Sequence, residues 1–205
     1  DFYSDLKRII SNLYTKHSRI IYNGNSYAKE WEEEAKTRGL KNIKNAPEAF
    51  KAFTTENSIK MFEEYNVYRR EELLSRYNIK LEKYIKNITI ETKIMLEMAK
   101  QEILPQTLKY ANFLEETINK LKIEYYKENL QALIENINEL NIAIIDLQTE
   151  LSLAGKISGV EEKAKHFSHK IKPKMETVRE IVDNLEEMLP KEYWPIPTYS
   201  DMLNS

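Results

Sequence analysis

Two histidines and one glutamate come nearest to a chemical site in this sequence. Glu162, His166 and His169 stand at i, i+4 and i+7, so a helix would place all of them on one face. Imidazole and carboxylate groups are common metal ligands. The Glu-x-x-His element of dinuclear carboxylate bundles is absent, however, and no second half-site is visible. We therefore favour two surface histidines near a carboxylate, and keep a metal-binding helical enzyme as a competing hypothesis.

A basic stretch, YRREELLSRY, offers an anion site as an alternative to ordinary helix pairing. Arg69, Arg70 and Arg76 could clamp a phosphate group. Glu71 and Glu72 stand among them, and opposite charges on one helix surface pair with each other. We favour such helix-surface pairs over a phosphate clamp.

Two further candidates lie nearer the start of the chain. The segment EWEEEAK (residues 30–36) surrounds Trp31 with glutamates and could attract a cation or a basic partner. The favoured interpretation is the solvated face of an amphipathic helix with Trp31 turned inward. His17 has no evident serine or cysteine partner, so we expect a structural or exposed histidine.

Composition narrows the chemistry further. There are no cysteines and only four glycines in 205 residues, which excludes thiolate chemistry and leaves few phosphate-cradling loops. No Walker loop, GxGxxG, HExxH or GxSxG motif occurs. From the residues alone we predict a helical scaffold without a catalytic site, and we assign no catalytic, cofactor-binding or metal-ligating residue.

Charge and hydropathy bear on partners and location. Lys and Arg total 31 against 33 Asp and Glu, a formal net charge of -2, so we expect no nucleic-acid partner. No apolar run approaches the roughly 18 residues of a membrane span, and no signal-peptide pattern is visible. We expect a cytoplasmic protein without a membrane partner. Because the sequence starts at Asp1, we expect a processed product or an excised piece of a longer chain.

Short helices joined by turns are predicted for the first 66 residues. Residues 3–22 show helical apolar spacing, and the turn YNGNSY follows. Ser26 is expected to cap a helix that runs to Arg38 and stops at Gly39. Pro47 suits the first turn of the next helix, and Thr54 or Thr55 should cap another.

Longer helices follow from about residue 68. An apolar stripe runs from Tyr68 to Tyr126, where Pro105 should kink or split the helix. A hairpin break is predicted over Leu153–Gly159, and a last helix over Val160–Leu189 with Pro173 inside it. Short loops between long helices indicate antiparallel neighbours.

A heptad pattern of apolar residues occupies the segment between residues 130 and 151. Its members are Leu130, Leu133, Ile137, Leu140, Ile144, Leu147 and Leu151. Spacings of three and four residues indicate helices that pack side by side at shallow angles. The seam is either intramolecular core or an intermolecular coiled coil, and its short length favours the former.

Three segments carry a resemblance to a known family. The C-terminal LPKEYWPIPTYSDML (189–203) has a Trp-Pro-x-Pro-x-Tyr pattern, RIIYNGNSYAKEWEEEAKTRGLKN lies at 19–42, and EELLSRYNIKLEKYIKNITIETKIMLEMAKQEILP at 71–105. Together and in this order they resemble the C-terminal region of type III glutamine synthetases. The match is looser over 122–165, where only the helical character fits.

The resemblance implies a parent enzyme that joins glutamate and ammonia with ATP and divalent Mg or Mn, as well as a ring-shaped homo-oligomer. It implies partners in the chain's own catalytic module and in neighbouring subunits. The family's catalytic motifs match no position here, so this fragment alone is expected to be inactive and to hold no cofactor. Its expected role is structural, in oligomer assembly or regulation. A stand-alone helical interaction module is the alternative.

The predicted fold is all-α: an elongated antiparallel helical bundle with a shorter-helix N-terminal part and an extended Pro-rich C-terminal tail. Residues 1–66 resemble the end of the catalytic module, 67–190 form the bundle extension, and 191–205 form the tail. Pro195 and Pro197 favour an extended backbone, and Trp194, Ile196 and Tyr199 could anchor the tail in a groove. The tail is expected to dock on the bundle or on a neighbouring subunit.

Overall fold

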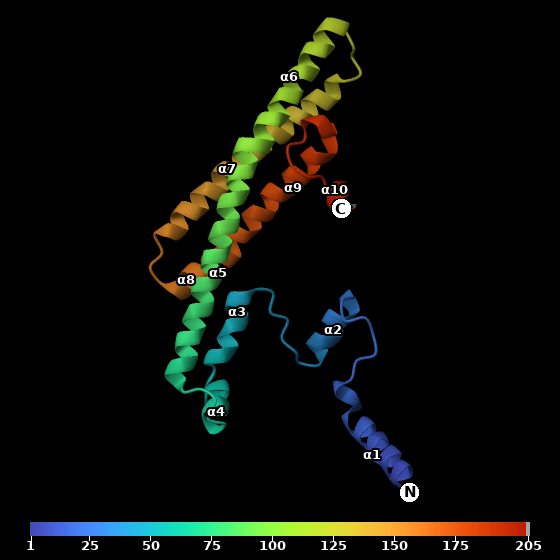
Figure 1. Cartoon of the computed structure of the whole chain (residues 1–205), viewed down its shortest axis with the longest axis vertical. Helices are drawn as coiled ribbons and strands as arrows, with labels where there is room; N and C mark the ends of the chain where they lie inside the picture. Colours follow the sequence, from blue (N-terminus) through green and yellow to red (C-terminus); the bar gives the residue numbers. More distant parts are fainter. Residues whose placement is uncertain (204–205) are drawn as a thin grey trace. The chain divides into compact units, whose positions relative to one another are not determined.

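The structure is a computed structural model that describes residues 1–203 (Figure 1). Every regular element in this range is helical, and no strand forms within it, as the all-α prediction requires. The chain divides into two compact units, Asp1–Lys44 and Asn45–Ser205. We describe each unit separately and call them the N-terminal unit and the bundle unit.

The N-terminal unit contains two helices and a single turn of 3-10 helix. Its elements are α1 (Phe2–His17), η1 (Ser18–Ile20) and α2 (Lys29–Thr37). The predicted cap at Ser26 is wrong: α2 begins after Ala28, which has an extended backbone and makes no side-chain cap. The predicted stop is confirmed, because Gly39 has a φ of 76°, a left-handed conformation that glycine adopts without steric cost.

Short helices open the bundle unit. They are α3 (Ala46–Phe50), η2 (Lys51–Thr54) and α4 (Glu56–Glu64). Pro47 lies in the first turn of α3 as predicted, and the Asn45 side chain accepts a hydrogen bond from the Glu48 N–H. Thr55 caps α4 by accepting from the Ser58 N–H, which confirms one of the two predicted caps.

Long helices form the rest of this unit. They are α5 (Arg70–Met98), η3 (Ala99–Ile103), α6 (Leu104–Leu121), α7 (Lys127–Gly155), α8 (Val160–His166), η4 (Phe167–Ile171) and α9 (Lys172–Met188). Figure 1 shows α6 continuing the line of α5 and α7 running back in the opposite direction. The hairpin break is shorter than predicted, because α7 continues through Gly155.

The two internal prolines neither end nor sharply break their helices. Each follows a π-helical turn: η3 precedes Pro105, and η4 precedes Pro173. Proline has no N–H to donate to the carbonyl one turn back, and its ring crowds that carbonyl. A π turn, with its wider hydrogen-bond register, accommodates the proline while the helix continues. This is why the predicted kink or split appears as a change of helix type.

The heptad seam is intramolecular core, as favoured from the sequence. Leu133, Leu140, Ile144 and Leu147 are buried, and α7 packs against both α6 and α9. On α9, Val178 and Leu185 are buried in the same cluster. Burial of these side chains removes apolar surface from water, at about 25 cal/mol per Å². The bundle unit therefore carries its own hydrophobic core.

The C-terminal tail is less extended than predicted. It contains the short helical elements η5 (Lys191–Tyr193) and α10 (Tyr199–Leu203). Only residues 194–198 between them are non-helical, and Trp194 there has an extended backbone. Residues 204–205 of the predicted tail lie outside the described part of the chain.

Candidate functional site

Glu162, His166 and His169, the candidate ligands of the competing metal hypothesis, do not converge on one point. His166 Nε2 lies 3.2 Å from a carboxylate oxygen of Glu150 on α7. His169 Nε2 lies 3.4 Å from the Glu48 carboxylate on α3. Glu162 lies against Gly159 at the start of its own helix. Each histidine thus has a carboxylate partner on a different element.

A metal centre finds no support in these positions. Within residues 1–203 there is no group of three His, Cys, Asp or Glu side chains placed to hold a metal ion. A stable protein metal site needs several convergent ligands. The histidines instead make contacts between helices: His166 joins α8 to α7, and His169 joins η4 to α3.

The arginines of the disfavoured phosphate clamp have separate partners. Arg70 donates two hydrogen bonds to the Glu56 carboxylate of α4, at 2.9 and 2.6 Å. The guanidinium of Arg76 stacks over the Tyr68 ring, 4.3 Å from its centroid. Glu72 accepts from the Arg69 backbone N–H. Pairing with glutamate is confirmed in kind for Arg70, but the partner comes from another helix because α4 packs against the start of α5.

Trp31 is turned toward its own unit, as predicted. The centroid of its ring lies 4.2 Å from that of the Tyr22 ring, and the Arg38 guanidinium lies 5.5 Å from the Trp31 ring centroid. Glu32 on the same helix faces Lys44 at 2.7 Å, and that hydrogen bond lowers the pKa of Glu32. The acidic face of α2 is thus solvated and partly paired within the unit. His17, at the end of α1, is exposed.

The apolar face of α1 is not buried within the N-terminal unit, which the sequence did not predict. Its members are Leu6, Ile9, Ile10, Leu13 and Tyr14, each at least 40% exposed. No residue of α1 is buried. The amphipathic spacing was visible in the sequence, but the spacing alone does not say whether another element covers the face.

The C-terminal tail docks on the bundle of its own chain. Trp194 is 7% exposed, and Ile196 packs against the same core cluster. The Tyr199 hydroxyl donates to Asp183 at 3.1 Å and accepts from Arg179 at 2.9 Å. Tyr199 therefore fastens the tail to α9, while Trp194 and Ile196 pack into the core cluster.

One carboxylate of the tail, that of Asp201, has a strongly lowered pKa. Hydrogen bonds from the Lys191 ammonium and from Thr198 lower the pKa of Asp201 to about 2. Lys191 and Asp201 stand on the two short helices of the tail, so this ion pair closes the tail on itself. The Arg179 guanidinium has a raised pKa because of its hydrogen bond to Tyr199 and the nearby Asp183 carboxylate.

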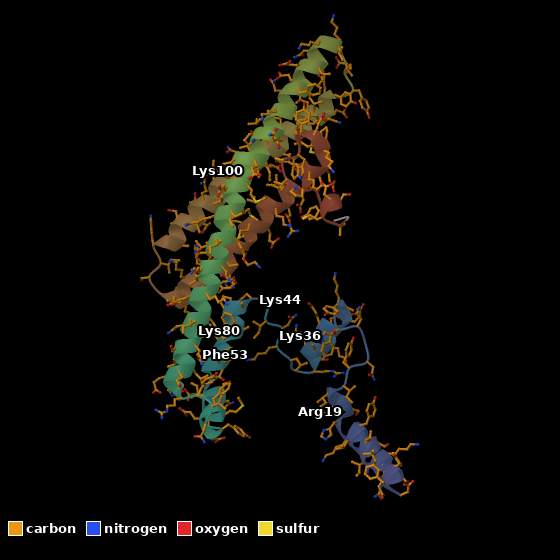
Figure 2. The ribbon with its side chains drawn as sticks, in the orientation of Figure 1. Arg19, Lys36, Lys44, Phe53, Lys80 and Lys100 are labelled. Carbon is orange, nitrogen blue, oxygen red and sulfur yellow. The ribbon has the colours of Figure 1, made fainter. Side chains whose placement is uncertain are left out.

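A cationic contact also joins the short helices to the bundle. Lys80 of α5 lies 5.5 Å from the ring centroid of Phe50 and 5.3 Å from that of Phe53. Figure 2 shows Lys80 and Phe53 beside one another on these elements. Such contacts stabilise exposed sites by about 0.5–1 kcal/mol. Lys80 therefore helps to pack α3 and η2 against α5.

These pairings define an all-helical protein whose candidate chemical residues are engaged in structural contacts. Comparison with known proteins identifies the family. Residues 5–122 match the family model described as the glutamine synthetase C-terminal domain. The chain belongs to this family.

Its relatives are similar over nearly the whole chain. A glutamine synthetase of Butyrivibrio fibrisolvens is 30% identical over 98% of this chain, and a type-3 glutamine synthetase of Dictyostelium discoideum is 28% identical over 96%. A glutamine synthetase of Bacteroides fragilis is also 28% identical over 96%. The chain is thus homologous to type III glutamine synthetases.

The relatives are much longer than this chain. The matched stretch spans 30% of the Butyrivibrio protein and 28% of each of the other two.

In the described residues 1–203, no helix is both long and apolar enough to cross a membrane.

Proposed function

We propose that this chain is the C-terminal region of an ATP-dependent glutamate–ammonia ligase, a glutamine synthetase that acts in nitrogen assimilation. The observation that carries the proposal is its similarity, over 98% of its length, to a protein more than three times as long. On this proposal the region is structural and has no activity by itself. ATP and Mg or Mn bind elsewhere in the enzyme, and the protein acts in the cytoplasm.

The region's role is to join the catalytic module and neighbouring subunits of a ring-shaped homo-oligomer. The uncovered face of α1 supports this role, because a helix of 16 residues is marginal in water unless its apolar side is packed. Leu6, Ile9 and Leu13 would supply that packing by burial against the rest of the enzyme.

The division of labour follows the resemblance. Residues 1–66 would complete the catalytic module, 67–190 would form the helical extension, and 191–205 would fasten the end of the chain. The internal core of α6, α7 and α9 supports an extension that keeps its own structure. The docked Trp194 supports a tail that stabilises this extension.

The test uses the full-length protein. Leu6→Asp, Ile9→Asp and Leu13→Asp are combined, and glutamine formation from glutamate, ammonia and MgATP is measured together with oligomer mass by light scattering. We expect loss of the oligomer and at least a tenfold loss of activity, because charges replace the packed face.

A matched control carries the same added charge on polar positions of the same helix. Ser4→Asp, Ser11→Asp and Thr15→Asp should preserve both assembly and activity, since these side chains are already polar and exposed. If the apolar-face variant assembles and works normally, the docking role is wrong. If the unmodified full-length protein makes no glutamine, the ligase assignment is wrong.

A further inference from the structure

A cavity opens in the bundle unit where α6, α7 and α9 meet near the α6–α7 hairpin. Its volume is about 490 Å³, and its lining comes from all of these helices. Sites for small molecules have volumes of about 300–1,000 Å³ and are often found between the helices of bundles. The cavity is therefore large enough for a small organic ligand.

The inner wall is apolar and aromatic. Leu114 of α6 and Leu133 of α7 line it, and Met188 contributes from the end of α9. Tyr110 stands beside them, with its ring backed by Tyr193 at 5.0 Å between centroids. This wall can contact the carbon skeleton of a ligand and present aromatic electron density to it.

The polar part of the lining is acidic. Glu128 and Glu187 both line the open cavity, together with Asn129, and no lysine or arginine does; all three residues are exposed to solvent. Neither carboxylate forms an ion pair with any other side chain in residues 1–203, whereas several other glutamates of the chain do. Two negative charges on one cavity repel anions and attract cations, at a range limited by salt screening.

We propose that this cavity binds a small organic cation, an aliphatic ammonium or guanidinium compound. The carboxylates of Glu128 and Glu187 would hold its charged groups, and Tyr110 would pack against its carbon chain and cationic head. The two carboxylates favour a positively charged ligand. The aromatic and apolar wall favours an organic cation over an inorganic one.

Tyr110 contributes an aromatic ring and no charge to the lining. Burial, with smaller effects of Tyr126 and Tyr193, raises the pKa of the Tyr110 phenol. A phenol is neutral at physiological pH, so Glu128 and Glu187 are the acidic side chains of the lining. A simple metal ion fits poorly, because the described residues place no set of three ligating side chains together.

Agmatine is a suitable probe because it has an ammonium group at one end and a guanidinium group at the other. Binding to the 205-residue chain is measured by isothermal titration calorimetry at fixed ionic strength. The comparison compound is 4-guanidinobutanoate, in which a carboxylate replaces the ammonium end. We expect agmatine to bind at least tenfold more tightly, because the second carboxylate of the cavity repels the acid.

Three variants locate the site. Glu128→Gln and Glu187→Gln should each weaken agmatine binding by about fivefold or more, and Tyr110→Leu should weaken it several-fold. Glu135→Gln, an exposed position on α7 outside the cavity, removes the same charge and should change binding less than twofold. Circular dichroism confirms that each variant remains folded.

The outcomes are separable. Equal binding of agmatine and 4-guanidinobutanoate, or no binding, would overturn the proposal. An equal loss in Glu135→Gln and Glu128→Gln would also overturn it, since that pattern indicates diffuse attraction to an acidic surface. The assay needs no glutamine formation, so its result does not depend on the ligase proposal.

Discussion

The N-terminal unit and the bundle unit use similar amphipathic helices in opposite ways. In the bundle unit, the apolar seam of α7 is covered by α6 and α9, and Leu140 is completely buried. In the N-terminal unit no residue of α1 or α2 is buried, and Ile10 remains 57% exposed. The helical pattern is alike, but only one unit holds the partner that covers it.

This difference teaches that the two units obtain stability from different sources. The bundle unit gains it from its own core. The N-terminal unit relies on surface contacts, such as Arg38 over the Tyr22 and Trp31 rings, which are individually weak. Its stability should therefore depend on what covers α1, and the following changes test that contrast.

The largest expected effect is in the core of the bundle unit. Leu140→Ala should lower the free energy of unfolding by about 2–5 kcal/mol, because it removes packed methyl groups and leaves a cavity. Urea unfolding followed by circular dichroism measures this. In the same 205-residue chain, Ile10→Ala on the exposed face of α1 is the matched control, with an expected change within about 0.5 kcal/mol. Equal losses at both positions would contradict the contrast.

Tail docking should give the next largest effect. Trp194→Ala should cost at most about 3 kcal/mol, because the tail can detach without unfolding of the helices beneath it. Thermal unfolding measures the loss. Tyr199→Phe, which removes the hydroxyl contacts to Asp183 and Arg179 but keeps the ring, should cost about 1 kcal/mol or less. An unchanged melting temperature for Trp194→Ala would show that the tail contributes nothing.

A glycine pair sharpens the comparison at smaller scale. Gly39→Ala places a side chain at a φ of 76° and should destabilise the end of α2 by about 1 kcal/mol. Faster amide exchange in α2, with bundle unfolding unchanged, is the expected readout. Gly155→Ala in α7 meets no atom within 4 Å and should be neutral or slightly stabilising. The opposite order would contradict the conformational argument.

Acid should open the Lys191–Asp201 ion pair within the tail before it unfolds the bundle. The pKa of Asp201 is lowered to about 2, so its stabilising contribution is complete above its ordinary pKa of 3.8 and is lost as the pH falls through about 2. Trp194 fluorescence should therefore change between pH 4 and pH 2. Asp201→Asn should remove that change, and its persistence in the variant would exclude Asp201 as the cause.

Local features were predictable because they depend on neighbouring residues. The stop at Gly39, the first-turn position of Pro47 and the cap at Thr55 all follow from backbone preferences within one helical turn. The cap at Ser26 was wrong, because Ala28 has the extended backbone that opens α2. Pro105 was expected to kink or split its helix and Pro173 was placed inside one, but the π turn that precedes each of them was not predicted.

Partners distant in sequence were not predictable from the residues. The spacing of Glu162, His166 and His169 placed them on one helical face, whereas His166 meets Glu150 and His169 meets Glu48. Helix packing brings those carboxylates into reach, and periodicity carries no information about it. The cavity lined by Tyr110 and Glu187 likewise exists only where separate helices meet.

The sequence by itself determined the helical class, the heptad pattern and the family resemblance, because apolar periodicity and short motifs depend on neighbouring residues. Tertiary structure decided which amphipathic faces are covered. It buried the seam around Leu140 and docked Trp194 on its own bundle, and within the N-terminal unit it left the apolar face of α1 unburied. The physical reason is that an apolar face specifies a need for burial, while only the arrangement of the other helices specifies whether that need is met.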